Sequence, residues 1–323
     1  MARKPRIEFP HALYHVIARG NQRRNIFLES VDYSKYLGLV VRYKEYYGFK
    51  LFAYALMKNH IHLLIETGDV ILSKIMQGLQ QTYTQYFNWK YDQIGHVFHG
   101  RYKALLCQKD EYLLELVRYI HLNPIRAGII SDLARYPWTS HLIYVRSSSC
   151  PLIDRNSVLQ LFHSNMTRAR VLYMQFLRDG MKRGHTEFLD DISGGRILGK
   201  QSFVKGCQDA DDTRNAVVLH VERRSMIHIF ETICEYHKIR PEVAQLKIKT
   251  ATVVNIRRLF SYIARVYYRY DMKEIGTFLG LDPTTITKQV QRVEYSMGME
   301  VELGNQITQL LRLIRGRNAD FQA

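Results

Sequence analysis

Apolar and polar residues alternate with a period of two in four short stretches of the first third of the chain. This pattern predicts β-strands, and the stretches are residues 11–18, 49–56, 60–67 and 104–108. Apolar positions three and four apart instead predict amphipathic helices, over residues 32–47, 71–89 and 110–124. Asp32 and Asp110 are the expected N-caps of the first and third of these helices.

The predicted order is strand, helix, strand, strand, helix, strand. This order is typical of the ferredoxin-like fold, an α+β architecture with an antiparallel sheet and helices on one face. Such a sheet leaves its other face open for a ligand. Residues 1–145 are therefore expected to form one domain.

The pattern loosens after residue 145. Residues 146–216 are expected to be a linker or irregular connecting region with one helix at 165–178, and the acidic residues between 190 and 212 indicate no regular element. Residues 217–323 carry helical periodicity again. The last part of the chain is therefore predicted to be a separate all-α domain.

Within this domain, residues 271–290 have the form helix, glycine turn, capped helix, with Asp282 as N-cap and Pro283 at the first helical position. This form indicates a helix-turn-helix, although an ordinary helical hairpin has the same pattern. The expected core positions of its second helix are Ile286, Val290 and Val293. The positions left for DNA are Thr284, Thr285, Lys288 and Arg292. The basic pair Arg257 and Arg258 favours the DNA-binding interpretation.

The charge balance points to a polyanionic partner. The chain has 46 Lys and Arg against 30 Asp and Glu, a formal net charge of +16, and the excess lies in both end regions rather than in one tail. Nucleic acid is the first partner to expect and a membrane surface the competing one. Four scattered cysteines and the absence of a long apolar run suggest a cytoplasmic protein that does not enter a membrane.

His60 and His62 stand two apart in the third predicted strand, between apolar residues. The period of a strand places both imidazoles on one face, which is half of a metal site. Two such histidines can also be purely structural, satisfied by backbone carbonyls or water.

Tyr119 and Asn123 stand four apart on the third predicted helix, so a phenol and an amide project one above the other. Both could simply complete the helix surface. If they face the histidines, two imidazoles and an amide oxygen make a three-ligand set that suits Mg²⁺ or Mn²⁺, with Zn²⁺ as an alternative. Tyr119 would then be within reach to attack a phosphate, giving a phosphotyrosine bond.

Basic and amide side chains surround these positions in loops and at element ends. They suit phosphate contacts, although a solvated surface turn is an equally good interpretation. The candidates for binding DNA are Arg19, Asn21, Arg23, Arg101, Lys103 and Arg126.

Three segments, residues 14–21, 55–66 and 118–128, closely resemble the single-tyrosine HUH transposases, particularly the branch of REP-associated tyrosine transposases. The resemblance implies that residues 1–145 are an HUH domain, with His60, His62 and Asn123 as metal ligands and Tyr119 as nucleophile. It also implies single-stranded, hairpin-flanked DNA as substrate and a 5′-phosphotyrosine intermediate.

Residues 257–294 resemble the DNA-binding domain of the bacterial chromosomal replication initiator. That family has Asp-His-Thr-Thr where this chain has Asp-Pro-Thr-Thr at 282–285, so the same DNA box is not expected. The sequence thus predicts a metal-dependent DNA transesterase with a duplex-binding module, acting in the nucleoid as a monomer or homodimer. The alternatives are a non-catalytic DNA-binding regulator and an HUH replication-initiator nickase.

Overall fold

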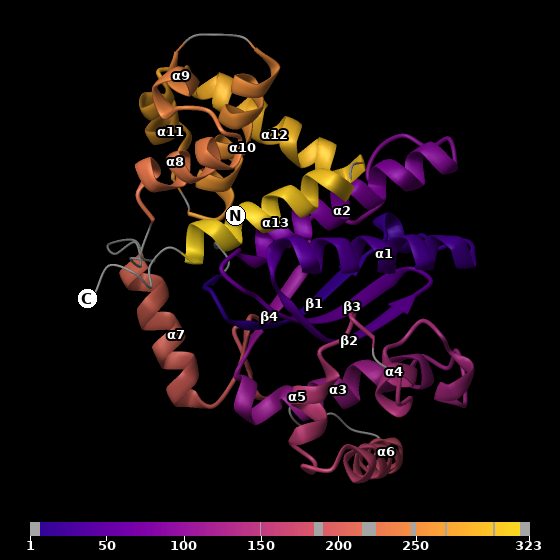
Figure 1. The fold of residues 1–323 in the computed structure, drawn as a ribbon. Helices are drawn as coiled ribbons and strands as arrows, with labels where there is room; N and C mark the ends of the chain where they lie inside the picture. Colours follow the sequence, from indigo (N-terminus) through magenta and orange to yellow (C-terminus); the bar gives the residue numbers. More distant parts are fainter. Residues whose placement is uncertain are drawn as a thin grey trace. The chain divides into compact units, whose positions relative to one another are not determined.

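The structure is a computed structural model that describes residues 7–148, 150–183, 190–214, 224–246, 250–268, 270–299 and 301–316. The chain divides into two compact units, residues 1–217 and residues 218–323. Each unit is described by itself (Figure 1).

The first unit is built on an antiparallel sheet. Its central strands are β1 (Leu13–Arg19), β2 (Lys50–Met57), β3 (His60–Glu66) and β4 (Lys103–Cys107). They lie in the order β2-β3-β1-β4, and each neighbouring pair is antiparallel. The prediction of an α+β fold with a ferredoxin-like sheet is confirmed.

Helices cover both faces of this sheet. Helices α1 (Ser30–Tyr47) and α2 (Leu72–Lys90) pack against each other on one face, and α3 (Lys109–Arg126) lies on the other face against β2 and β3 (Figure 1). The expectation that all helices share one face and leave the other open therefore needs correction. The physical reason is that β3 is buried at six of its seven positions, on both of its faces.

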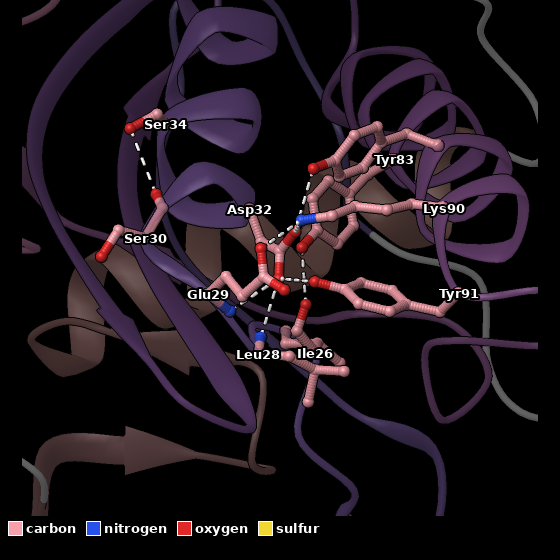
Figure 2. Close-up of polar contacts among 10 residues, drawn as sticks. Ile26, Leu28, Glu29, Ser30, Asp32, Ser34, Tyr83, Lys90 and Tyr91 are labelled. Carbon is pink, nitrogen blue, oxygen red and sulfur yellow. Dashed lines mark hydrogen bonds and ion pairs between the residues drawn. The ribbon is translucent and has the colours of Figure 1, made fainter.

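The starts of two helices differ from the predicted caps. Helix α3 begins at Lys109, so Asp110 lies in its first turn, and it continues past Pro124 to Arg126. Helix α1 begins at Ser30, and Asp32 is a fully buried residue inside its first turn. The Asp32 carboxylate accepts hydrogen bonds from the backbone N–H groups of Leu28 and Glu29 (Figure 2), so it fixes the loop that enters the helix.

The stretch expected to be an irregular connection is part of the first unit. It follows η2 (Leu133–Arg135) and α4 (His141–Val145), which lie in the predicted first domain. Its own elements are α5 (Arg155–Gln160), α6 (Met166–Arg183), β5 (Ile192–Ser193), β6 (Ile197–Leu198) and α7 (Gln201–Arg214). Strand β6 pairs in parallel with β4, so β5 and β6 extend the sheet to six strands. The expectation that no regular element lies between 190 and 212 is wrong.

The outer edge of β2 is also occupied. Trp138 O accepts a hydrogen bond from Leu56 N, and Ser140 N donates to Tyr54 O. Asp154 both donates from its backbone N–H to Leu51 O and accepts from Leu51 N through its carboxylate. Later parts of the chain therefore cover both edges of the four-stranded core.

The second unit is helical throughout its described residues. Its helices are α8 (Met226–Tyr236), α9 (Pro241–Gln245), α10 (Ala251–Val266), α11 (Met272–Leu279), α12 (Pro283–Met299) and α13 (Val301–Gly316). The buried helix α10 packs against α8, α11 and α12. The predicted segment at 217–223 lies outside the described residues. The all-α prediction for this unit is confirmed.

Candidate active site

The two histidines of β3 share one face of the sheet, as their spacing predicts. Their ring centroids are 5.1 Å apart. His62 is buried at 4% exposure, whereas His60, at the start of the strand, is half-buried. The pair therefore runs from the interior of the unit towards its surface.

A third histidine, His15 on β1, completes the cluster. Its Nε2 lies 2.9 Å from Nδ1 of His62, and the two rings stack with centroids 5.2 Å apart. Sequence reasoning missed this residue, because its contact depends on the pairing of β1 with β3, in which His62 lies opposite Ile17. The alternation of the first strand, which places His15 and Ile17 on one face, was the available signal.

All three imidazoles are held neutral near pH 7. Burial, together with the charge of nearby Arg19, lowers the pKa of His60 to about 4. Burial likewise lowers the pKa of His15 to about 4, and burial followed by the neighbouring His15 and His60 lowers the pKa of His62 well below its usual range. Neutral imidazole is the form that can donate a lone pair to a metal ion.

Helix α3 brings Tyr119 to the same cluster. The phenol ring packs edge-on against His15 and His62, with centroid separations of 5.7 and 6.2 Å. The guanidinium carbon of Arg126 lies 5.2 Å from the centre of the phenol ring. The geometry thus brings together Tyr119, the histidines and one of the predicted basic residues.

Asn123 lies one helical turn after Tyr119 on α3. Its amide nitrogen donates to the backbone carbonyl of Tyr119 at 3.3 Å, which leaves its carboxamide oxygen to act as a ligand or acceptor. Within the described ranges, no group of three or more His, Cys, Asp or Glu side chains is placed to hold a metal ion. A carboxamide oxygen is a ligand type outside that set, and Asn123 carries one on the same helix as Tyr119.

Two predicted DNA-binding residues share the face of the histidines. Arg19 lies directly opposite His60 across the β1–β3 ladder. Lys103 and His62 both lie opposite Ile17, one on each side of β1. Residues opposite each other in an antiparallel ladder point to the same side, so Arg19 and Lys103 flank the histidines. Both side chains are exposed.

The remaining basic candidates lie in two loops that bind each other. Asn21 and Arg23 form η1 (Asn21–Arg23), and the backbone N–H of Asn21 donates to Val97 O at 2.8 Å. His99 N in turn donates to Arg19 O. Arg23 and Arg101 are exposed. These contacts join residues 19–24 and 95–103 into one basic rim beside β1.

The second unit presents the face expected of a helix-turn-helix. In α12, Ile286, Val290 and Val293 are buried, as predicted. Lys288, Arg292 and Thr284 are exposed and Thr285 is half-buried. Asp282 caps the helix through Thr284, accepting from its N–H at 2.8 Å and from its hydroxyl at 2.6 Å.

The expectation that both Arg257 and Arg258 favour DNA binding needs correction for Arg257. Arg257 is buried at 7% exposure and its Nε donates to Ala244 O at 2.9 Å, so it packs inside the unit and does not face DNA. Arg258, in contrast, is half-buried. Burial and then the nearby charge of Arg292 lower the pKa of its guanidinium. Arg258 therefore lies close to the outer face of α12.

Comparison with known proteins gives two family matches in different parts of the chain. Residues 9–123 match the model of IS200-like transposases, and residues 226–293 match the bacterial DnaA helix-turn-helix. Among curated proteins, the chromosomal replication initiator protein DnaA of Caldanaerobacter subterraneus subsp. tengcongensis is 24% identical over 125 residues. That alignment covers 38% of this chain and 28% of the relative.

Among solved structures, a REP-associated tyrosine transposase bound to a REP hairpin aligns with 47% of this chain and 90% of that chain. The alignment has a TM-score of 0.40 and 15% sequence identity. In the described part of the chain, no helix has the length and apolar character needed to cross a bilayer. The chain thus joins a segment that matches IS200-like transposases, residues 9–123, to a segment that matches the DnaA helix-turn-helix, residues 226–293.

Proposed function

We propose that this protein is a metal-dependent transesterase of single-stranded, hairpin-flanked DNA that works through a 5′-phosphotyrosine intermediate. The observation that carries the proposal is the position of Tyr119, whose ring packs against His15 and His62 beneath the guanidinium of Arg126. A helix-turn-helix that binds duplex DNA completes the proposed function, and its setting would be the nucleoid in the cytoplasm.

His60, His62 and Asn123 would hold the metal ion, for which Mg²⁺ or Mn²⁺ is proposed. The fit rests on two neutral imidazoles on one face of β3 and on the carboxamide of Asn123 at the flank of α3. Such an ion, when bound, acts as a Lewis acid towards a phosphate oxygen.

In the proposed reaction the Oη of Tyr119 attacks phosphorus. The bond from Oη to phosphorus forms while the bond from phosphorus to the 3′ oxygen breaks, the phenol proton passes to water, and the 3′ oxygen leaves with a proton. Arg126 favours the developing phenolate through its charge. Because the phosphotyrosine retains the energy of the phosphodiester, a 3′ hydroxyl can reverse the step without ATP.

The basic residues around the histidines would hold the strand. Arg19 and Lys103 flank the cluster on its own face, and the rim of residues 19–24 and 95–103 extends this positive surface. Contacts of this kind position a nucleic acid without reading its sequence. Asn21, Arg23 and Arg101 are assigned to this role.

Incubation with labelled single-stranded hairpin oligonucleotides and Mg²⁺ or Mn²⁺ tests the proposal. We expect a covalent adduct of protein and DNA that resists denaturation and that Tyr119→Phe abolishes, because the phenylalanine keeps the ring contacts but lacks Oη. The matched control is Tyr112→Phe, which removes a hydroxyl from the same helix; its Oη donates to Asp191 instead.

An adduct that survives Tyr119→Phe would overturn the assignment of the nucleophile. Complete absence of adduct across hairpins of varied sequence, with folded protein and retained DNA binding, would favour the non-catalytic regulator. Rejoining of the cleaved strand to a second oligonucleotide would support transposase-like strand transfer over a nickase.

A further inference from the structure

Each of the two histidines of β3 has its Nδ1 engaged by a neighbouring side chain. Nδ1 of His60 lies 2.7 Å from the carboxamide oxygen of Asn59. Nδ1 of His62 lies 2.9 Å from Nε2 of His15. Neither Asn59 nor His15 has a role in the proposed reaction. Each of them nevertheless contacts the Nδ1 atom of one of the two histidines.

The Asn59 contact has a defined direction. The carboxamide nitrogen of Asn59 donates to the backbone carbonyl of Arg23 at 3.2 Å, which turns its oxygen towards His60. A carboxamide oxygen only accepts hydrogen bonds, so Nδ1 of His60 carries the hydrogen. A neutral imidazole with its hydrogen on Nδ1 has its lone pair on Nε2.

The His15 contact allows the same arrangement at His62. Two neutral imidazoles that meet nitrogen to nitrogen share one hydrogen, so one ring donates and the other accepts. If His15 accepts through Nε2, the hydrogen lies on Nδ1 of His62 and the lone pair of His62 lies on Nε2. Both histidines of β3 would then offer equivalent nitrogens.

We propose that His15 and Asn59 are positioning residues that fix His62 and His60 in the tautomer whose Nε2 binds the metal ion. This inference rests on the proposed function, because it requires the metal site there. Histidine ligands of metals commonly donate their other ring N–H to such a partner, which orients the ring and raises its basicity.

His15 is a poor ligand itself. Its Nε2 already contacts Nδ1 of His62, the ring with which it would have to share the metal ion. Its position is fixed by β1, where its neighbours Tyr14 and Val16 are buried at 1% and 0% exposure. His15 is therefore placed to hold the ring of His62 in position.

Binding of Mn²⁺ to the full-length protein, measured by electron paramagnetic resonance without DNA, tests the inference. We expect His15→Leu to weaken Mn²⁺ binding by about 10- to 100-fold, since leucine fills space but accepts no hydrogen bond. His15→Gln, whose side-chain oxygen can accept from Nδ1 of His62, should restore binding to within a few-fold. Asn59→Ala should weaken binding, and Asn59→Asp should retain more of it.

A second measurement separates positioning from loss of structure. In the metal-free protein, the ¹⁵N shifts of His62 should report the hydrogen on Nδ1, and His15→Leu should move it towards Nε2 while the thermal unfolding stays cooperative. Mn²⁺ binding that depends on His62 but not on His15 would overturn this inference and leave the proposed function standing. Mn²⁺ binding unchanged by His62→Ala would overturn the metal site itself.

Discussion

Asp32 is a single carboxylate on which the entry to α1 and the end of α2 converge. It is fully buried, and it accepts hydrogen bonds from two backbone N–H groups and three side chains. Those from Leu28, Glu29, Lys90 and Tyr91 can be followed in Figure 2. The donors are Leu28 N, Glu29 N, Tyr86 Oη, Lys90 Nζ and Tyr91 Oη. The loop that Asp32 fixes continues from the basic residues 19–24, so this buried charge supports the basic rim.

The ionised state of Asp32 should make stability depend on pH in acid. Burial alone would raise the pKa of Asp32, but hydrogen bonds from Lys90, Tyr91 and the two backbone groups outweigh it and lower the pKa to about 2. A lowered folded-state pKa contributes stability above the unfolded-state value near 3.8, and this stability is lost as pH falls towards 2.

We expect Asp32→Asn to lower the free energy of unfolding at neutral pH by on the order of 2 kcal/mol. Urea unfolding measured between pH 5 and pH 2 should show less loss of stability with falling pH in this variant than in the unchanged protein. Equal pH dependence of the two proteins would mean that Asp32 is not the titrating group. Asp69 of the same unit, whose side chain is 45% exposed, serves as the control through Asp69→Asn.

Asp32 and His15 also show what sequence can and cannot predict about single residues. The spacing predicted that His60 and His62 share a face and that Tyr119 and Asn123 lie one turn apart, because strand and helix periods fix which side chains share a face. That the two pairs belong to one site was implied by the family resemblance. The partners of Asp32 come from residues 54 to 59 positions later. The contact of His15 spans 47 positions, and no local period encodes such distances.

At the scale of elements, the packing of α1 on α2 depends on one glycine. A Cβ added to Gly78 of α2 would lie 2.6 Å from Cε1 of Tyr43 on α1. Tyr43 is buried and its hydroxyl is held 2.8 Å from Thr82 Oγ1, so the ring has little room to move.

We therefore expect Gly78→Ala to destabilise the protein by about 1–3 kcal/mol through overpacking. The matched control is Gly38→Ala on α1, where an added Cβ meets nothing within 4 Å. That change should stabilise by about 0.5–1 kcal/mol through helix propensity alone. Thermal unfolding of both variants measures these changes in stability. If Gly78→Ala stabilises the protein, the ring of Tyr43 can move to make room for the added methyl group.

Elements long enough to repeat their strand or helix period several times were predictable, and very short elements were not. The four central strands and helices α1, α2, α3, α6 and α10 follow patterns of alternating or helical spacing. Strands β5 and β6 have two residues each, too few to show any period. Helix α7 carries an acidic stretch at 209–212, and that composition resembles a solvated loop.

At the scale of the whole molecule, the net charge of +16 is divided between two units with separate DNA-binding surfaces. In the proposed function, the rim of the first unit would hold a single strand near Tyr119 and the outer face of α12 would hold a duplex. The two activities should therefore respond to different substitutions.

We expect the double change Lys288→Ala with Arg292→Ala to weaken duplex binding and to reduce its salt dependence by about two phosphate contacts. Filter binding or fluorescence anisotropy across a salt series measures the slope, and the hairpin adduct at Tyr119 should form as before. Lys238→Ala with Arg240→Ala removes the same charge from exposed positions outside α12. If this control lowers the slope equally, general charge and not the face of α12 governs binding.

The cover on both sheet edges has a consequence for how the polypeptide can be divided. Strand β6 occupies the free side of β4, and Trp138, Ser140 and Asp154 bind backbone groups of β2. A chain cut at residue 145 would keep the matched transposase segment and every candidate catalytic side chain, yet it would uncover the outer side of β4 and remove the Asp154 contacts of Leu51 on β2. Exposed strand edges recruit other strands. Self-association and aggregation, more than loss of chemistry, would limit such a fragment.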